Sequence, residues 1–178
     1  KRILGIDYGR VRTGFAVSDL LGLTANGIGT FKASGDRVLI EHICELVKEH
    51  DISEIVIGNP INMDGSRGDS SSKVKYLAGL IEKDTGLPVI LFDERCTTML
   101  AHKILNATDT RGAKRKSVVD TLSAQIILQN YLDTKKYFLL MKEMENEGVR
   151  FMNVNSVDKK RRAPIISAIT MIILMAAT

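Results

Sequence analysis

The sequence predicts an α/β fold built on a mixed sheet, and two observations lead to it. Three strand-like stretches follow one another closely, at residues 2–8, 11–19 and 23–31. Such short connections are typical of antiparallel hairpins. Two short, almost wholly apolar stretches come later, at residues 54–58 and 88–92, and this composition is typical of parallel strands covered on both faces. We therefore expect a sheet that begins antiparallel and continues with βα units.

The helices are predicted from apolar spacing and from the residues at their ends. Ser34 is placed to N-cap a helix that runs to about His50. Its apolar face is predicted to consist of Val38, Leu39, Ile43, Leu46 and Val47. Further helices are expected at residues 73–84, with Gly86 as the stop signal, and at residues 98–106 and 117–133. The resulting order, βββαβαβαα, is that of a ribonuclease H-like fold, with five strands and helices on both faces of the sheet.

Composition narrows the class of protein. The chain has 178 residues and a net charge of +4, which is compatible with a nucleic-acid partner without being diagnostic. Cys44 and Cys96 are widely separated, so neither a zinc site nor a disulfide framework is indicated, and a reducing cytoplasmic setting is expected. We expect one domain over residues 1–136 and an extension over residues 137–178. The apolar run at residues 165–177 is too short for a membrane span.

Carboxylates stand at three positions of this predicted fold. Asp7 ends the first strand, and Asp93 and Glu94 end the last one. In open α/β sheets, ligands collect at the carboxyl ends of the strands. Asp120 lies in the last helix, and the residues three and four positions after it are small, which would let this helix approach the sheet.

Carboxylates held close together repel each other, and a hard divalent cation such as Mg²⁺ or Mn²⁺ relieves the repulsion. Two such ions about 4 Å apart would hold the attacking water and the leaving oxygen of a phosphodiester. In the alternative, Asp7 caps a turn, Asp120 pairs with an arginine and Asp93 and Glu94 are solvated. The presence of three acidic positions on elements in this order favours the metal site.

Basic residues surround these positions. Arg10 and Arg12 flank the first turn. Arg12 is predicted either to hold a phosphate or to be a surface arginine that faces Asp19 or solvent. Arg95 adjoins the acids and is expected to pair with one of them or to contact phosphate. A basic loop just before the last helix is predicted to bind nucleic acid through Arg111, Lys114, Arg115 and Lys116.

At these residues the chain resembles the YqgF/RuvX family, the Holliday-junction-resolvase-like nucleases of bacteria. The resemblance covers residues 1 to about 136. Its matching segments are Gly5–Gly9 with Arg12, Gly14, Ala16, Ser18 and Asp19; Gly58 with residues 60–66; Asp93–Arg95 with Thr97 and Thr98; and Lys114–Lys116 leading to Asp120 and residues 127–132.

The resemblance implies a metal-dependent ribonuclease H-like nuclease that matures the 5′ end of the precursor of small-subunit (16S) ribosomal RNA. It implies Asp7, Glu94 (or Asp93) and Asp120 as the metal-binding acids. Asp93 and Glu94 would point to opposite faces of a continuing strand, so one ligand is expected there, and Glu94 is favoured for its reach. The expected partner is structured RNA, bound by a monomer or a homodimer.

Three alternatives stay open. A resolvase of four-way DNA junctions would need a dimer of sites. A non-catalytic nucleic-acid-binding module would keep binding after loss of Asp7. A phosphotransferase of the actin-like or sugar-kinase class is disfavoured, because such proteins need two domains of this kind.

Overall fold

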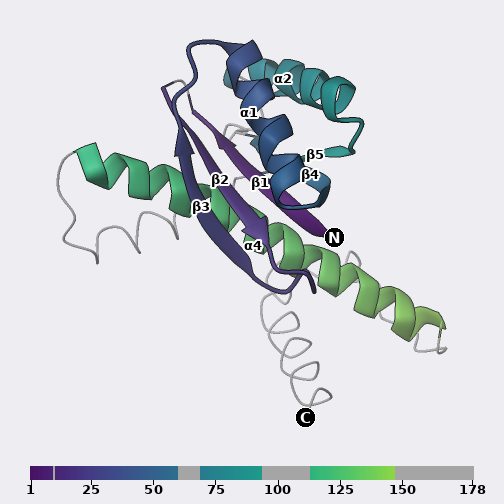
Figure 1. Cartoon of the computed structure of the whole chain (residues 1–178). Coiled ribbons are helices and arrows are strands. Elements are labelled where there is room, and N and C mark those ends of the chain that lie inside the picture. Colours follow the sequence, from purple (N-terminus) through teal and green to yellow (C-terminus); the bar gives the residue numbers. More distant parts are fainter. Residues whose placement is uncertain (10, 60–68, 94–112, 147–178) are drawn as a thin grey trace. The chain divides into compact units, whose positions relative to one another are not determined.

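A computed structural model describes residues 1–9, 11–59, 69–93 and 113–146 (Figure 1). At residues 69–70, 93, 113–117 and 144–146 the backbone is described without the side chains. The chain divides into two units, residues 1–136 and 137–178, and the sheet lies wholly within the first. In the ranges described, no helix has both the length and the apolar character to cross a membrane. The predicted helix at residues 98–106 and the apolar run at 165–177 lie outside these ranges.

The five strands form one mixed sheet in the order β3-β2-β1-β4-β5. Their bounds are Arg2–Tyr8 (β1), Thr13–Ser18 (β2), Ala25–Phe31 (β3), Ile52–Asn59 (β4) and Val89–Asp93 (β5). β2 runs antiparallel to both β1 and β3, whereas β4 runs parallel to both β1 and β5. The prediction of a ribonuclease H-like sheet is confirmed, and β1 lies at its centre.

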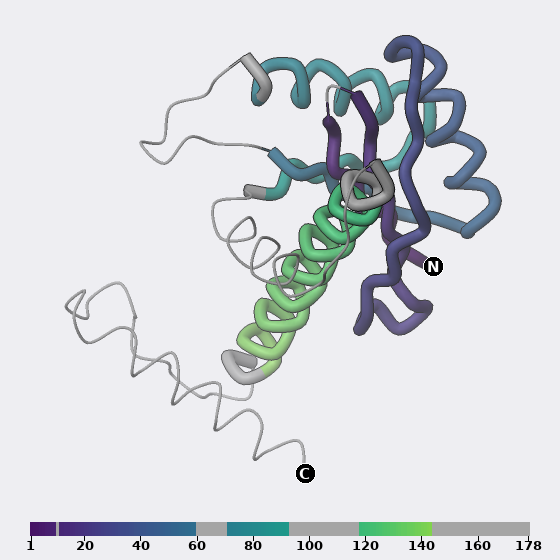
Figure 2. The backbone as a smooth tube through the Cα atoms, turned by 90° about the vertical axis from the view of Figure 1, so that its left-hand side faces the viewer, coloured from purple at the N-terminus to yellow at the C-terminus, as the bar shows by residue number. Residues whose placement is uncertain are grey.

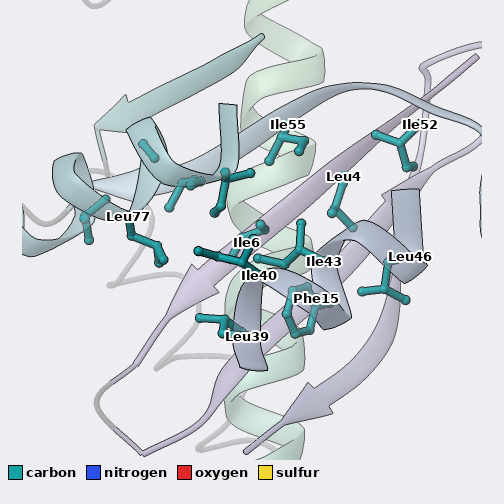
Figure 3. Packing of buried hydrophobic residues seen from close by; sticks show 14 of the residues in the cluster. Leu4, Ile6, Phe15, Leu39, Ile40, Ile43, Leu46, Ile52, Ile55 and Leu77 are labelled. Atoms are coloured by element: carbon teal, nitrogen blue, oxygen red, sulfur yellow. The ribbon is translucent and has the colours of Figure 1, made fainter. Parts of the chain in front are cut away.

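In the described part of the chain, one face of the sheet is covered by α1 (Asp36–Glu49) and α2 (Asp69–Thr85). The cluster between them and the strands is wholly aliphatic and aromatic, and Figure 3 shows its centre, with Leu4, Ile6, Phe15, Ile43, Ile55 and Leu77 among its buried members. Because successive side chains of a strand alternate between faces, this cluster takes the even-numbered residues of the middle of β1.

The details of α1 differ from the prediction. The helix begins at Asp36, after Gly35, and no side chain caps it, so Ser34 is not its N-cap. Ile40 is buried, whereas Val38 is 39% exposed. The predicted apolar face, at positions 38, 39, 43, 46 and 47, is rotated slightly from the face that is buried. Packing against β1 and β2 determines which face is buried.

Among the residues that the structure describes, the helix on the opposite face of the sheet is α4 (Ala113–Asn146). Figure 2 shows α4 and α1 on opposite sides of the strands. The second core cluster includes Ile3, Ala16, Val56, Ala124, Leu128 and Leu132. This helix begins earlier than predicted, so Lys114, Arg115 and Lys116 are helical and do not form a loop before the helix. Alanine, lysine and arginine are strong helix formers, which favours the helix over the predicted loop at residues 113–116.

Glycines on the strands let α4 lie close against the sheet. A Cβ atom built on Gly14 would overlap the backbone oxygen of Asp120. One built on Gly5 would lie 2.7 Å from Cβ of Leu128, well inside van der Waals contact. The sheet therefore accepts the α4 backbone directly, and this contact determines how near Asp120 comes to β1.

Candidate active site

Asp7 lies near the end of β1 and belongs to the face that α4 covers. Its neighbour Ile6 is buried in the cluster under α1 and α2, and Gly5 faces Ala124 and Leu128 of α4. Strand alternation therefore places Asp7 on the α4 side. The pKa of Asp7 is raised from its ordinary value of 3.8 to about 6. Burial is the largest cause, the negative charge of Asp120 adds to the rise, and a hydrogen bond from Ser123 opposes it.

Helix α4 supplies both of these neighbours of Asp7. Asp120 and Ser123 are three residues apart, the spacing that places two side chains on one face of a helix. Sequence reasoning had noticed position 123 only as a small residue beside Asp120. The available signal was the spacing of three residues between Asp120 and Ser123, which places both on the helix face that meets Asp7.

Arg12 forms an ion pair with Asp120. Its Nε donates to Oδ2 of Asp120 at 2.9 Å, and the two side chains are 25% and 27% exposed. The expected alternative that Asp120 pairs with an arginine is therefore realised. The alternative pairing of Arg12 with Asp19 is wrong, since Arg12 pairs with Asp120. Oδ1 of Asp19 accepts hydrogen bonds from the N–H groups of Leu23 and Thr24 in its own loop.

The end of the last strand, β5, lies at the same edge of the sheet as the end of β1. Gly58 pairs with Phe92 and Asn59 with Asp93, while Ile6 pairs with Ile57 on the other side of β4. The backbones of β1 and β5 thus end at the same edge, with β4 between them.

The remaining predicted site residues lie beyond what the structure describes. They are the side chain of Asp93 and the whole of Arg10, Glu94, Arg95 and Arg111, together with the side chains of Lys114, Arg115 and Lys116. Within the described residues, no group of three or more histidine, cysteine, aspartate or glutamate side chains is placed to hold a metal ion. The structure therefore assembles two of the three predicted carboxylates, Asp7 and Asp120.

The chemistry of this pair fits a divalent cation. Oxygen donors are what Mg²⁺ prefers, and it needs only one or two carboxylates because it keeps several waters. Burial first, and the charge of Asp120 second, raise the pKa of Asp7, so its ionised form is unfavourable there and added positive charge would stabilise it. Arg12 already meets part of the negative charge at Asp120.

Comparisons with known proteins identify the family of the chain. Residues 1–134 match the model of the RuvX family, described as Holliday junction resolvase. A protein of Heliobacterium modesticaldum named "Putative pre-16S rRNA nuclease" is 45% identical over 146 residues, covering 82% of this chain and 97% of that protein. A protein of the same name from Bacillus subtilis is 45% identical over 136 residues, covering 75% of this chain and 98% of that protein.

Among solved structures, Thermus thermophilus RuvC in complex with a Holliday junction substrate gives a TM-score of 0.49 at 14% identity. That match covers 76% of this chain and 95% of the RuvC chain. The family match over residues 1–134 and the relatives at 45% identity show that the chain belongs to the RuvX family.

Proposed function

We propose that this chain is a nuclease that hydrolyses phosphodiester bonds and processes the 5′ end of pre-16S ribosomal RNA in the cytoplasm. The observation that carries the proposal is that Asp7 and Asp120 lie near each other at the carboxyl end of the central strand. Burial and the charge of Asp120 raise the pKa of Asp7 to about 6 there. Buried acids of this kind are typical of functional sites. The names of the relatives supply the substrate.

We assign the metal-binding role to Asp7, Asp120 and one acid at or just after the end of β5. We favour Glu94 for the reach of its longer side chain, with Asp93 as the alternative. Bound Mg²⁺ or Mn²⁺ would supply positive charge to the phosphate and a more acidic water.

The residues of this chain have further tasks in the proposed reaction. Ser123 orients the carboxylate of Asp7, and Asp7 and Asp120 together concentrate negative charge at one point. Arg12 is already placed beside Asp120, and its planar guanidinium is suited to bind a phosphate with two parallel hydrogen bonds. The nucleic-acid backbone is further bound by Arg10, Arg95, Arg111, Lys114, Arg115 and Lys116.

Residues 1–136 form the nuclease domain in this proposal, acting as a monomer or a homodimer. A second candidate function is favoured by the family's description as Holliday junction resolvase. Cutting a four-way DNA junction symmetrically requires two sites, so this function would require the homodimer.

The proposal is tested by cleavage assays with Mg²⁺ or Mn²⁺. The substrates are a 5′-extended precursor of 16S ribosomal RNA and a four-way DNA junction, each incubated with the wild-type chain, Asp7→Asn or Asp84→Asn. Asp84 is exposed at the end of α2 and is a matched control for loss of one carboxylate. We expect metal-dependent RNA cleavage that Asp7→Asn abolishes and Asp84→Asn retains.

The other outcomes are distinct. Cleavage of the junction without cleavage of the RNA would establish the resolvase. Binding of both nucleic acids without any cleavage would contradict catalysis and leave a binding module.

A further inference from the structure

A cavity lies between β3, the outer strand of the described sheet, and the second half of α1. Its volume is about 400 Å³, within the range of about 300–1,000 Å³ that is usual for ligand pockets. The residues that line it come from β2, β3 and α1 and include Phe15, Ile28, Gly29, Phe31, His42 and Glu49. Phe15 belongs to the cluster under α1 and α2, so the cavity lies on the α1 side of the sheet. Asp7 and Asp120 lie on the α4 side, and the reaction proposed above leaves the cavity unused.

The wall that β3 contributes contains a β-bulge. Gly29 pairs with Phe15 of β2, and Gly27 pairs with the next residue of β2, so Ile28 is an extra residue in β3. Gly29 has a φ of 130°, which residues with a side chain rarely adopt, and a Cβ atom built on it meets no other atom within 4 Å. The bulge therefore leaves open space over the backbone of Gly29, where a bound group can approach closely.

Aromatic rings form the inner wall of the cavity. The rings of Phe31 and His42 are stacked with their centroids 4.0 Å apart, and the ring of Phe15 meets that of His42 edge-on at 5.5 Å. These contacts hold the three rings in place between two strands and a helix. Ile28 lines the same cavity and is 38% exposed. A fixed apolar wall of this kind favours an apolar occupant, because little side-chain ordering opposes the burial of apolar surface there.

The rim of the cavity on α1 is acidic. Glu45 and Glu49 are four residues apart and lie on one side of the helix, with side chains that are 77% and 70% exposed. They lie 3.5 Å from His42 and 3.9 Å from His50, and an imidazole compensates a carboxylate only when it is protonated. Among the described residues that line the cavity, none is a lysine or an arginine. The rim therefore attracts cationic groups and repels phosphate.

We propose that this cavity is a docking site for a partner protein, and that it holds one apolar side chain of a short peptide segment whose neighbouring residues are basic. The apolar side chain lies against the aromatic rings and Ile28, and the basic neighbours pair with Glu45 and Glu49. The charge of the rim selects such a segment over RNA, whose phosphates it repels. The site is on the opposite side of the sheet from Asp7 and Asp120, so the inference is independent of the proposed cleavage.

The experiment measures the binding of three fluorescent peptides to the full chain by anisotropy. The first peptide is Lys-Lys-Leu-Lys-Lys, the second has serine in place of leucine, and the third has glutamate in place of every lysine. We expect the leucine peptide to bind, and the serine peptide to bind roughly tenfold more weakly, because burial of one leucine side chain changes an equilibrium constant by at least that factor. The glutamate peptide should not bind, because the rim repels it.

Two variants with matched controls locate the binding. Ile28→Ser should raise the Kd of the leucine peptide by roughly fivefold, whereas Ile90→Ser on β5 should leave it within about twofold, since Ile90 is 37% exposed and does not line the cavity. Glu49→Gln should raise the Kd by roughly threefold at low salt, and the exposed Glu82→Gln of α2 should not. Thermal unfolding of each variant verifies that the fold is retained.

Three results would overturn the inference. The first is no binding of the leucine peptide at about 1 mM, and the second is equal affinity for the leucine and serine peptides. The third is a loss of affinity for the 5′-extended 16S precursor in Ile28→Ser, with no change in peptide binding, which would assign the cavity to RNA. The cleavage assay with Asp7→Asn is unaffected by any of these results, so the proposed nuclease is tested separately.

Discussion

Asp7 of β1 and Asp120 of α4 lie on the same side of the sheet but have different electrostatic surroundings. Asp120 has the guanidinium of Arg12 at 2.9 Å. Asp7 has burial, the charge of Asp120 and the hydroxyl of Ser123, and the first two effects outweigh the third. The folded chain therefore holds Asp7 in a position where its ionised form is disfavoured, and this has a measurable consequence for stability.

The stability of the chain should depend on the ionisation of Asp7. A carboxyl whose pKa is raised on folding favours the folded state while it is protonated. Its contribution is fully present below pH about 4 and is lost as the pH rises through about 6, because the folded state binds the proton more tightly over that range. Asp7→Asn removes this loss, so without divalent metal the variant should be more stable than the wild type above pH 6, by up to about 3 kcal/mol.

Urea denaturation between pH 4 and pH 8, in the presence of a chelator, measures the effect. The two curves of unfolding free energy should diverge between pH 4 and pH 6 and then run parallel. Asp84→Asn, at an exposed position of α2, should follow the wild type throughout. Parallel curves for Asp7→Asn over the whole range would show that the carboxyl is not disfavoured in the fold.

At the scale of elements, the contact between α4 and the sheet determines the site geometry. The Cβ atom of alanine at position 14 would overlap the backbone oxygen of Asp120, and backbone cannot move aside as a flexible side chain can. Gly14→Ala should therefore push the helix away from β2 and destabilise the chain by about 1–3 kcal/mol, the usual range for overpacking. It should also weaken cleavage, because Asp120 moves with the helix. Chemical denaturation and the RNA cleavage assay measure the two effects.

Gly79→Ala provides the matched control. Gly79 lies within α2 in ordinary helical conformation, and a Cβ atom there meets no other atom within 4 Å. The substitution should stabilise the chain by about 0.5–1 kcal/mol, because alanine has the higher helix propensity. A stabilised or unchanged Gly14→Ala variant would mean that α4 adapts without cost and that the close approach is not needed.

Elements were predictable where a local pattern determines them. The apolar run of β4 and the stop of α2 at Gly86, whose φ is 67°, follow from short stretches of sequence. The predicted starts of α1 and α4 were wrong, because a possible capping serine and a short basic segment are weak local signals. Packing against the sheet and the helix propensity of residues 113–116 prevailed at these two positions.

For the whole molecule, the site depends on contacts between distant parts of the chain. Composition and strand order predicted that Asp7 and Asp120 belong to one site, and the structure brings them together. The partner of Arg12 could not be chosen from the sequence, because Asp120 is 108 positions away and Asp19 only seven. In the fold, Asp120 lies beside Arg12, while Asp19 accepts hydrogen bonds from backbone N–H groups of its own loop.

The first unit should fold without most of the residues that follow it. Leu132 is the last residue of α4 in the described core, and Lys135 makes the last ion pair to the sheet, with Glu54 of β4. The relative from Bacillus subtilis is matched over 98% of its length by 75% of this chain. A chain ending at Met141 keeps more than one helical turn beyond Lys135, so fraying of the new terminus does not reach that ion pair.

We expect this shortened chain to unfold with the same free energy as the full chain, within about 1 kcal/mol, and with the same dependence on urea. It should also keep the RNA cleavage rate, because both carboxylates and Arg12 lie in the first unit. The dependence on urea is the sharper measurement, since it scales with the surface exposed on unfolding. A clear decrease in this dependence on urea, together with a lower free energy of unfolding, would mean that residues after Met141 pack on the first unit. The boundary of the domain would then lie further along the chain.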